Sequence, residues 1–406
     1  MGVIQIKGNC LIAQSGGPTS VINNSLLGII EHALQWNSIG NIYGAVNGLV
    51  GILNETYIDF RTLSNNKLMS LRNTPGAALG TCRYKISDQE IEKVIEIFSK
   101  MNIRYFFYIG GNGSMQVANM IYEKALEKKF DLIVMGVPKS IDNDLMHTDH
   151  SPGYGSSAKF LATCILDIAM DHKSFMHSHR VTIIETMGRN AGWLAGSCAL
   201  ASKIDNDIPL LIYLPESAFS LEKFLCDVTR TYQQYGYCLA VVSEGVRDEA
   251  ARLIAVENKK DALGRDQLGG VSSYLTQVIE EQTTYSARYL LPSIWQRSGM
   301  MISSKVDVEE AYEVGKRAFE FAKKEHSGMM VNLIRSKPLS AYEIDYGMVQ
   351  LRKVAQTEKR VPAEWYDKTQ STMSDKFIEY VEPLIQGEIF VPMKNGLPYY
   401  QMLTAH

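Results

Sequence analysis

Short runs of apolar residues alternate with longer segments of helical periodicity from the N-terminus to about residue 250 of this 406-residue chain. The runs are rich in Ile, Val, Leu, Phe and Tyr, and several end at Gly or Pro, as buried strands do. Alternating strands and helices predict parallel sheets that helices cover on both faces. The predicted strands are 10–14, 104–109, 132–137, 181–186, 209–214 and 238–243, and the predicted helices between them are 20–36, 116–128, 156–170 and 221–235.

The later part of the chain is more helical, notably over 268–281 and 308–324, and the charged stretch 247–267 is predicted to be a surface excursion. The length suits two lobes with buried cores. No low-complexity linker separates two halves of the sequence, so we expect the chain to cross between the lobes. The predicted fold class is α/β, with two lobes that are each a largely parallel sheet sandwiched by helices.

Composition narrows the functional class. The apolar content of 46% and the charged content of 21% are ordinary for a soluble globular protein, and a net charge of −3 gives no electrostatic basis for binding nucleic acid or an anionic membrane. Six cysteines occur without a C-x-x-C pair, which indicates a reducing compartment. We therefore expect a cytoplasmic protein with neither a membrane span nor a nucleic-acid partner.

The segment 138–144, Pro-Lys-Ser-Ile-Asp-Asn-Asp, carries the strongest chemical signal. It follows a nearly all-apolar predicted strand, and the carboxyl ends of strands are where open α/β sheets build their sites. One of the carboxylates of Asp142 and Asp144 can take a proton while the other holds a cation or orients its neighbour. Lys139 adds a point charge suited to phosphate. Phosphoryl transfer needs these groups.

Three other predicted strand ends carry unusual residues. The segments 14–19 and 110–114 are glycine-rich turns into helices and suit phosphate, although the second is neither a Walker loop nor a Rossmann fingerprint. A tight turn for the first, and an N-cap role for Ser114, remain alternatives. Arg189, in 185–193, can reach a phosphoryl group or form a surface salt bridge. Beyond it, 195–201 is predicted to be a helix of small residues.

Five histidines, at 147, 150, 172, 177 and 179, raise a zinc hypothesis. They lack an H-E-x-x-H pattern and accompanying cysteine ligands. Ordinary hydrogen-bonding histidines are the favoured interpretation.

Four motifs occur in a characteristic order: Gly-Gly-x-Gly-Ser, Pro-x-Ser-Ile-Asp-Asn-Asp, Met-Gly-Arg-x-Ala-Gly and Ser-Glu-Gly-Val. In this combination the chain resembles the phosphofructokinases from about residue 10 to about residue 322. The segment 73–84, together with Lys139, looks most like the bacterial pyrophosphate-dependent branch. The resemblance implies a donor-binding lobe of 1–153 plus about 297–355. It also implies a sugar-phosphate-binding lobe of about 154–296 plus the C-terminal segment.

The implied reaction is phosphoryl transfer from pyrophosphate to the 1-hydroxyl of fructose 6-phosphate, giving fructose 1,6-bisphosphate in glycolysis, with Mg²⁺ as cofactor. An ATP-dependent 6-phosphofructokinase is the alternative, and a non-catalytic sugar-phosphate-binding subunit is a third possibility. In the family, the arginine matching Arg180 comes from a neighbouring subunit. The resemblance therefore implies a homodimer or homotetramer.

The resemblance also assigns roles to residues. Asp142 is the expected general base, Asp144 supports it or the metal, and Arg189 stabilises charge on the transferring group. Expected metal ligands are Asp142, Asp144 and, weakly, Asn112. The implied donor-binding residues are Gly16, Arg83, Gly111, Asn112, Gly113, Ser114 and Lys139. The implied sugar-binding residues are Ser140, Ile141, Asp142, Arg180, Met187, Gly188, Arg189, Glu244, Arg288 and Arg297.

Some positions depart from the family pattern. Asn112 stands where an aspartate is common, which weakens a magnesium contact, and Ile294 stands where ATP-using relatives often carry a sugar-binding histidine. Lys139 is the residue typical of pyrophosphate enzymes, whereas Gly113 is the open residue typical of ATP enzymes. The donor is therefore predicted to be pyrophosphate on the likeness of the whole chain, with ATP as the alternative.

Overall fold

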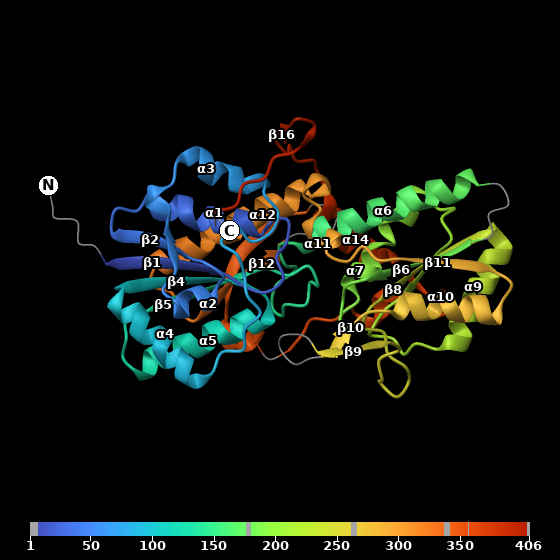
Figure 1. The fold of residues 1–406 in the computed structure, drawn as a ribbon, viewed down its shortest axis with the longest axis horizontal. Helices are drawn as coiled ribbons and strands as arrows, with labels where there is room; N and C mark the ends of the chain where they lie inside the picture. The colour runs from blue at the N-terminus through green and yellow to red at the C-terminus, as the bar shows by residue number, and fades with distance from the viewer. Residues whose placement is uncertain (1–6, 176–179, 261–265, 337–341, 356, 404–406) are drawn as a thin grey trace. The chain divides into compact units, whose positions relative to one another are not determined.

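The computed structural model describes residues 7–175, 180–260, 266–336, 342–355 and 357–403 (Figure 1). The chain divides into two compact units. The first unit comprises 1–156, 297–358 and 387–406, and the second comprises 157–296 and 359–386. The expected lobe boundaries at 153 and 297 lie close to these crossings. The C-terminal segment, which we expected in the second lobe, is shared, because 387–406 returns to the first unit.

The described residues of the first unit form a seven-stranded sheet with the order β13-β12-β5-β4-β1-β2-β3. The five inner strands run parallel, and the edge strands β13 and β3 pair antiparallel to their neighbours. In chain order the strands are β1 (Gly8–Gln14), β2 (Ile39–Ala45), β3 (Tyr57–Asp59), β4 (Ile103–Gly110), β5 (Ile133–Pro138), β12 (Met329–Arg335) and β13 (Ile344–Gln350).

Helices cover both faces of this sheet because its central strands are apolar on both sides. In β4, Tyr105 and Phe107 point into one core while Phe106 and Tyr108 point into the other. The first core includes α1 (Ile22–Leu34) and α12 (Lys305–Lys323), and the second includes α4 (Asp88–Lys100) and α5 (Asn112–Glu127). Figure 1 shows these two helix pairs on opposite sides of the sheet.

The second unit contains a four-stranded, fully parallel sheet among its described residues, with the order β11-β6-β8-β7. Its strands are β6 (Arg180–Thr186), β7 (Leu210–Tyr213), β8 (Tyr237–Ser243) and β11 (Ser286–Leu290). The helices α9 (Leu221–Tyr235) and α10 (Val271–Gln282) pack on one face, and Figure 1 shows α6 (Tyr154–Ser174) along the other.

The shorter elements complete the fold and correct some expectations. The helix predicted over 195–201 is two short helices, α7 and α8, and the excursion 247–267 contains the strands β9 and β10. None of the described helices is long and apolar enough to cross a membrane. The remaining helices are α2 (Leu49–Leu53), α3 (Asn65–Ser70), α7 (Trp193–Ser197), α8 (Leu200–Ile204), α11 (Trp295–Ser298), α13 (Leu351–Val354) and α14 (Asp375–Val381), and the remaining strands are β9 (Val256–Lys260), β10 (Asp266–Leu268), β14 (Tyr366–Asp367), β15 (Thr372–Met373), β16 (Met393–Lys394) and β17 (Leu397–Pro398).

Two glycines allow α1 and α12 to pack closely. A Cβ atom on Gly28 would overlap the backbone carbonyl of Tyr312, and one on Gly315 would overlap the backbone carbonyl of Ser25. Backbone atoms of two packed helices cannot move aside as a flexible side chain does. The absence of side chains at these positions therefore sets the distance between the helices.

We expect Gly28→Ala to destabilise the first unit, although alanine is the better helix former by about 1 kcal/mol. Overpacking against a backbone carbonyl should outweigh that gain and lower the free energy of unfolding by about 1–3 kcal/mol. Chemical unfolding measures the change, with Gln116→Ala on an exposed position of α5 as the control. A Gly28→Ala protein as stable as this control would contradict the packing argument.

Candidate functional site

Three of the four strand-end segments that the sequence singled out, 14–19, 110–114 and 138–144, follow neighbouring strands at the carboxyl edge of the first sheet. The strands β5, β4 and β1 are neighbours, and their last residues are in register: Gly110 pairs with Pro138, and Gln14 pairs with Ile109. The loops that follow these strands must therefore leave the sheet side by side. This is the edge where open α/β sheets bind ligands.

Hydrogen bonds hold the acidic loop after β5 to its neighbour. The carboxylate of Asp144 accepts hydrogen bonds from the amide of Asn112 (2.8 Å) and from the hydroxyl of Ser140 (2.7 Å). The Ser140 hydroxyl also accepts from the backbone N–H of Asp142 (3.1 Å). The side chains of Ser140 and Ile141 are buried. The two acids are thus placed by a network that joins two strand ends.

The two polar atoms of the Asn112 side chain differ in their hydrogen bonding. Its amide nitrogen donates to Asp144, and its buried Oδ1 has no hydrogen-bond partner among the described residues. A buried carbonyl oxygen in this condition is suited to a cation. The described residues contain no group of three His, Cys, Asp or Glu side chains able to hold a metal ion. An ion at this edge would therefore take further ligands from a bound phosphate or from water.

Lys139 is buried beside the first glycine-rich loop. Its ammonium donates a hydrogen bond to the carbonyl of Gly17 (2.8 Å), and a Cβ on Gly16 would lie 3.3 Å from it. Burial lowers the pKa of Lys139 to about 8, although Asp142 and Asp144 act in the opposite direction. The protonated form of Lys139 is disfavoured because burial removes its ammonium from water.

Two arginines contribute to the same electrostatic field. Burial and the nearby charge of Arg83 lower the pKa of Arg297, and Asp142 opposes them. A Cβ on Gly17 would lie 2.7 Å from the guanidinium of Arg297. Arg83 and Arg297 also act on Lys139, lowering its pKa. Three cations therefore gather around two carboxylates, which favours an anionic ligand.

The second glycine-rich loop opens the helix α5. Gly111 is the N-cap residue, so Ser114, an N-cap candidate in the sequence, instead lies inside the first turn with its N–H donating to the Gly111 carbonyl. The first turn of a helix presents unpaired N–H groups to anions. No described atom lies within 4 Å of a Cβ placed on Gly113. The position is open.

The fourth strand-end segment, 185–193, and Glu244 form a separate group in the second unit. The strands β6 and β8 end in register at Thr186 and Ser243. Beyond them, the N–H of Gly188 donates to the Glu244 carboxylate (3.3 Å) and the Ser243 hydroxyl donates to the Gly188 carbonyl (2.5 Å). Gly188 has φ +135°, which a side chain would disfavour. Met187, Gly188, Arg189 and Glu244 thus lie at adjacent strand ends.

Two positioning residues in this unit were not predicted from the sequence. The buried Gln296 accepts a hydrogen bond from the N–H of Met187 (3.0 Å). The carboxylate of Glu216 accepts from the N–H groups of Gly192 (3.0 Å) and Val361 (2.9 Å), and burial raises its pKa. Glu216 follows the predicted strand 209–214 by two residues, and this position at a strand end could have marked it as a site residue in the sequence. Gln296 had no local signal.

The three arginines predicted to bind the 6-phosphate lie on separate segments of the chain. Arg297 belongs to the first unit, beside Arg83 and Asp142. Arg288 lies on β11 and lines a cavity of about 240 Å³ together with the carboxylates of Asp167 and Asp171. Arg180 begins β6, and its side chain lies outside the described residues.

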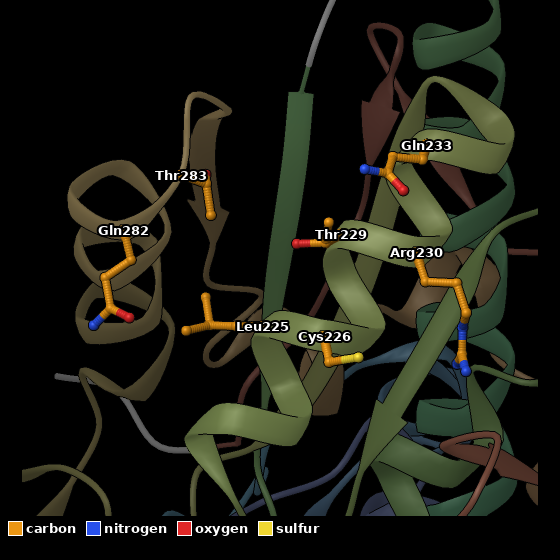
Figure 2. A pocket seen from close by; sticks show the side chains of 7 residues that line it. All are labelled: Leu225, Cys226, Thr229, Arg230, Gln233, Gln282 and Thr283. Carbon is orange, nitrogen blue, oxygen red and sulfur yellow. The ribbon is translucent and has the colours of Figure 1, made fainter.

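A larger cavity in the second unit, of about 380 Å³, lies away from the predicted residues. Figure 2 shows side chains of α9 and of the end of α10 lining it. The described lining residues include none that the motifs single out, so the cavity is not the candidate site. They are Leu225, Cys226, Thr229, Arg230, Gln233, Gln282 and Thr283.

The histidines do not form a zinc site among the described residues. His150 is buried between two carboxylates, and His172 hydrogen-bonds the hydroxyl of Thr182 (2.8 Å). The carbonyl of His147 accepts a hydrogen bond from Asn332. His177 and His179 lie outside the described residues.

Paired carboxylates, a helix N-terminus and clustered cations at the carboxyl edge of a parallel sheet define an enzyme of phosphoryl transfer. The chain belongs to the phosphofructokinase family, whose model matches residues 9–322. This finding confirms the resemblance that the four motifs indicated.

Individual relatives match nearly the full length. A pyrophosphate–fructose 6-phosphate 1-phosphotransferase of Methylococcus capsulatus is 37% identical, with 97% of this chain and 96% of the relative covered. The crystal structure of a pyrophosphate-dependent phosphofructokinase from Nitrosospira multiformis is similar with a TM-score of 0.89, at 37% identity and 98% and 96% coverage. A sulfofructose kinase of Alkalicoccus urumqiensis is 34% identical, covering 87% and 91%.

We expect Lys139→Met to stabilise the protein at neutral pH while it impairs anion binding. An unfolded lysine titrates near 10.5 and Lys139 near 8, so its charge weakens the folded state below about pH 8. The free energy of unfolding at pH 7 should rise by about 1–3 kcal/mol, and the gain should shrink as the pH approaches 10. Urea unfolding at several pH values measures this, with the exposed Lys93→Met as the control. A gain that is absent, or that grows with pH, would contradict the assignment.

Proposed function

We propose that this protein transfers a phosphoryl group from pyrophosphate to the 1-hydroxyl of fructose 6-phosphate, giving fructose 1,6-bisphosphate in glycolysis. The observation that carries the proposal is the buried Lys139 against the Gly16–Gly17 loop, beside Asp142 and Asp144. This lysine occurs in a chain whose whole length is similar to pyrophosphate-using relatives. The bonds broken and formed have similar transfer potential, so the reaction should run in both directions.

In the proposed mechanism, Asp142 takes the proton from the attacking hydroxyl, and Asp144 holds the loop in place through Asn112 and Ser140. Arg189 stabilises the negative charge of the transferring group. The donor phosphates contact cations and backbone N–H groups. The proposed donor-binding residues are Gly16, Arg83, Gly111, Asn112, Gly113, Ser114 and Lys139.

The sugar phosphate is recognised by polar groups that bind its hydroxyls and by arginines that bind its 6-phosphate. Glu244 accepts sugar hydroxyls, a role that suits a carboxylate already oriented by the Gly188 N–H. The other proposed sugar-binding residues are Ser140, Ile141, Met187, Gly188, Arg180, Arg288 and Arg297. A partner subunit supplies the residue equivalent to Arg180, so the active form is a homodimer or homotetramer.

The residues present fit a magnesium ion that the donor helps to hold. Asn112 offers an unpaired Oδ1, and Asp142 and Asp144 offer carboxylates, while the described residues lack a complete ligand cage. Mg²⁺ in phosphoryl-transfer enzymes commonly takes one or two carboxylates, water and substrate phosphates. When bound, the ion would neutralise developing charge on the phosphates. A cytoplasmic location, without nucleic-acid or membrane partners, belongs to the same proposal.

ATP is the second candidate donor, and the open space at Gly113 favours it. Coupled assays with pyrophosphate and with ATP, each on fructose 6-phosphate and on sulfofructose, test the proposal. We expect turnover with pyrophosphate and fructose 6-phosphate to dominate. Faster turnover with ATP would assign the alternative activity, and a lack of turnover with every pair would assign a non-catalytic binding subunit.

We expect Asp142→Ser to lower kcat by about 10²–10⁴-fold, because the general base is lost. Serine is a small polar residue that a loop tolerates, so the variant should fold as wild type does. Circular dichroism can verify this. The exposed Asp88→Ser on α4 removes the same charge without touching the site and serves as the control. Near-normal turnover of Asp142→Ser would remove Asp142 from the proposed mechanism.

We expect Gly113→Asp to suppress any ATP turnover by about tenfold or more while pyrophosphate turnover stays within a few-fold, since like charges brought together cost several kcal/mol. The open space around Gly113 accepts the side chain, so the fold should tolerate it. Gly113→Ala fills the position without charge and separates the steric effect from the electrostatic one. An unchanged donor preference in Gly113→Asp would refute this account of donor selection.

A further inference from the structure

A buried group of charged side chains lies in the first unit, apart from the proposed substrate-binding residues. We call it the loop anchor; it consists of Asp149, His150, Glu310, Arg335 and Tyr342. The side chain of His150 is 1% exposed and that of Glu310 is 8% exposed. Burial of charge is unfavourable unless the charges are paired, so the arrangement calls for a functional explanation.

His150 is held at both ends. Its Nδ1 lies 2.9 Å from the Asp149 carboxylate and its Nε2 lies 2.6 Å from the Glu310 carboxylate. Carboxylates only accept hydrogen bonds, so both ring nitrogens donate and the ring is an imidazolium. Burial alone would lower the pKa of His150, but Glu310 and Asp149 outweigh it and raise the pKa to about 9. The ring is therefore positively charged at neutral pH.

Other elements supply the remaining partners. Arg335, at the end of β12, donates to Asp149 (2.9 Å), and the hydroxyl of Tyr342 donates to Glu310 (2.5 Å). Burial by itself raises the pKa of Asp149, but His150 and Arg335 hold it well below its usual range. Two anions and two cations thus balance within the group. Loss of the charge on His150 would leave two carboxylates facing an uncharged ring.

The loop anchor is connected to the acidic loop by short links. His150 lies in the segment that returns from Asp144 to the helix α6. Next to it, the N–H of Ser151 donates to the buried Oδ1 of Asn143 (3.0 Å), the residue between Asp142 and Asp144. Asn143 has φ +53°, a conformation that needs such support. This hydrogen bond therefore links the segment that carries His150 to the loop that carries Asp142 and Asp144.

A second carboxylate of α12 holds the end of the same segment. Asp307 accepts hydrogen bonds from the N–H groups of Gly153 (2.8 Å) and Ser156 (2.9 Å), which begin α6. Glu310 follows Asp307 by three residues, so both side chains lie on one face of α12. Asp307 binds neutral backbone groups, whereas Glu310 binds an ionisable ring. The contact of Glu310 with His150 therefore depends on the protonation of the His150 ring, whereas the contacts of Asp307 with the backbone do not depend on it.

We propose that His150, clamped between Asp149 and Glu310, is a positioning residue that fixes the loop carrying Asp142 and Asp144 in its catalytic geometry. The inference rests on the proposed function in that Asp142 is taken as the general base. Lys139 has its own hydrogen bond to Gly17, so donor binding should depend less on the anchor than turnover does. Loosening the loop should therefore lower kcat with little change in KM for the donor.

The variant Glu310→Gln tests this, because it keeps the shape of the side chain and an oxygen that can accept from His150, but removes the charge. The imidazolium should then lose its proton at lower pH. Relative to wild type, kcat should fall by about tenfold or more near pH 8.5, since a small misplacement of a catalytic group is costly. It should recover toward wild type at pH 6, where His150 is protonated in both proteins. KM for pyrophosphate should change less than about twofold.

Glu313→Gln is the matched control, since Glu313 lies on the same helix and pairs with Lys316 and Arg317 instead of the loop. The titration of Lys139 is common to all the proteins and cancels in the ratios of kcat. Hydrogen–deuterium exchange of the segment 139–153 gives a readout that does not need activity. It should be faster in Glu310→Gln than in the control at pH 8.5, and equal at pH 6.

The outcomes separate the two proposals. A wild-type protein inactive with every substrate pair refutes the proposed function, and the exchange experiment then decides the anchoring alone. Equal exchange and equal kcat in Glu310→Gln and Glu313→Gln would overturn the inference, as would a loss of kcat independent of pH.

If Glu310→Gln does not fold, His150→Gln replaces it. Its kcat ratio to wild type should be low at pH 6 and should rise toward pH 10, where wild type loses the charge; a flat ratio overturns the inference.

Discussion

The hydrogen bonds from Asn112 and Ser140 to the Asp144 carboxylate are the contacts that hold the acidic loop at the edge of the first sheet. They join the ends of β4 and β5, and they leave the Asn112 Oδ1 without a partner among the described residues. A parallel sheet brings its strand ends to one edge, but it does not by itself orient the side chains there. The carboxylate supplies that orientation by accepting from both neighbouring segments. Phosphoryl transfer relies on such positioning more than on covalent chemistry.

Charge is concentrated at this edge at a cost to stability. Lys139 is buried next to Arg83 and Arg297, and its lowered pKa records how unfavourable the protonated form is in the free protein. A polyanionic donor would relieve this repulsion, since it restores opposite charges to all three cations. The loop anchor behind the acids is different, because its cations and anions balance without a ligand. An anionic ligand would therefore stabilise the charges around Lys139, whereas the charges of the loop anchor are already paired.

The apolar runs predicted β1, β4, β5, β6, β7 and β8 closely, because strands buried on both faces have an almost continuous hydrophobic sequence. In the first sheet, the strands at or next to an edge, such as β2 and β13, were missed. In β13, the side chains are only partly buried, and in β2 glycines and an asparagine interrupt the apolar pattern. The helix expected over 195–201 is divided into α7 and α8, and a Cβ on Gly196 in α7 would lie 2.7 Å from the ring of Phe377. Such contacts involve residues far apart in the chain.

The order and content of the motifs determined by themselves the family and the acidic loop with its Lys139, since each motif is local and follows a recognisable strand. Only the tertiary structure decided which distant side chains hold those motifs in place. Asp307 and Glu310 reach from α12 to the segment that follows the acidic loop, and Gln296 reaches Met187 from a segment more than a hundred residues later. Neither spacing nor composition marks such partners. A buried hydrogen bond is specified by three-dimensional proximity, and the chain brings these groups together only when the sheets and helices pack.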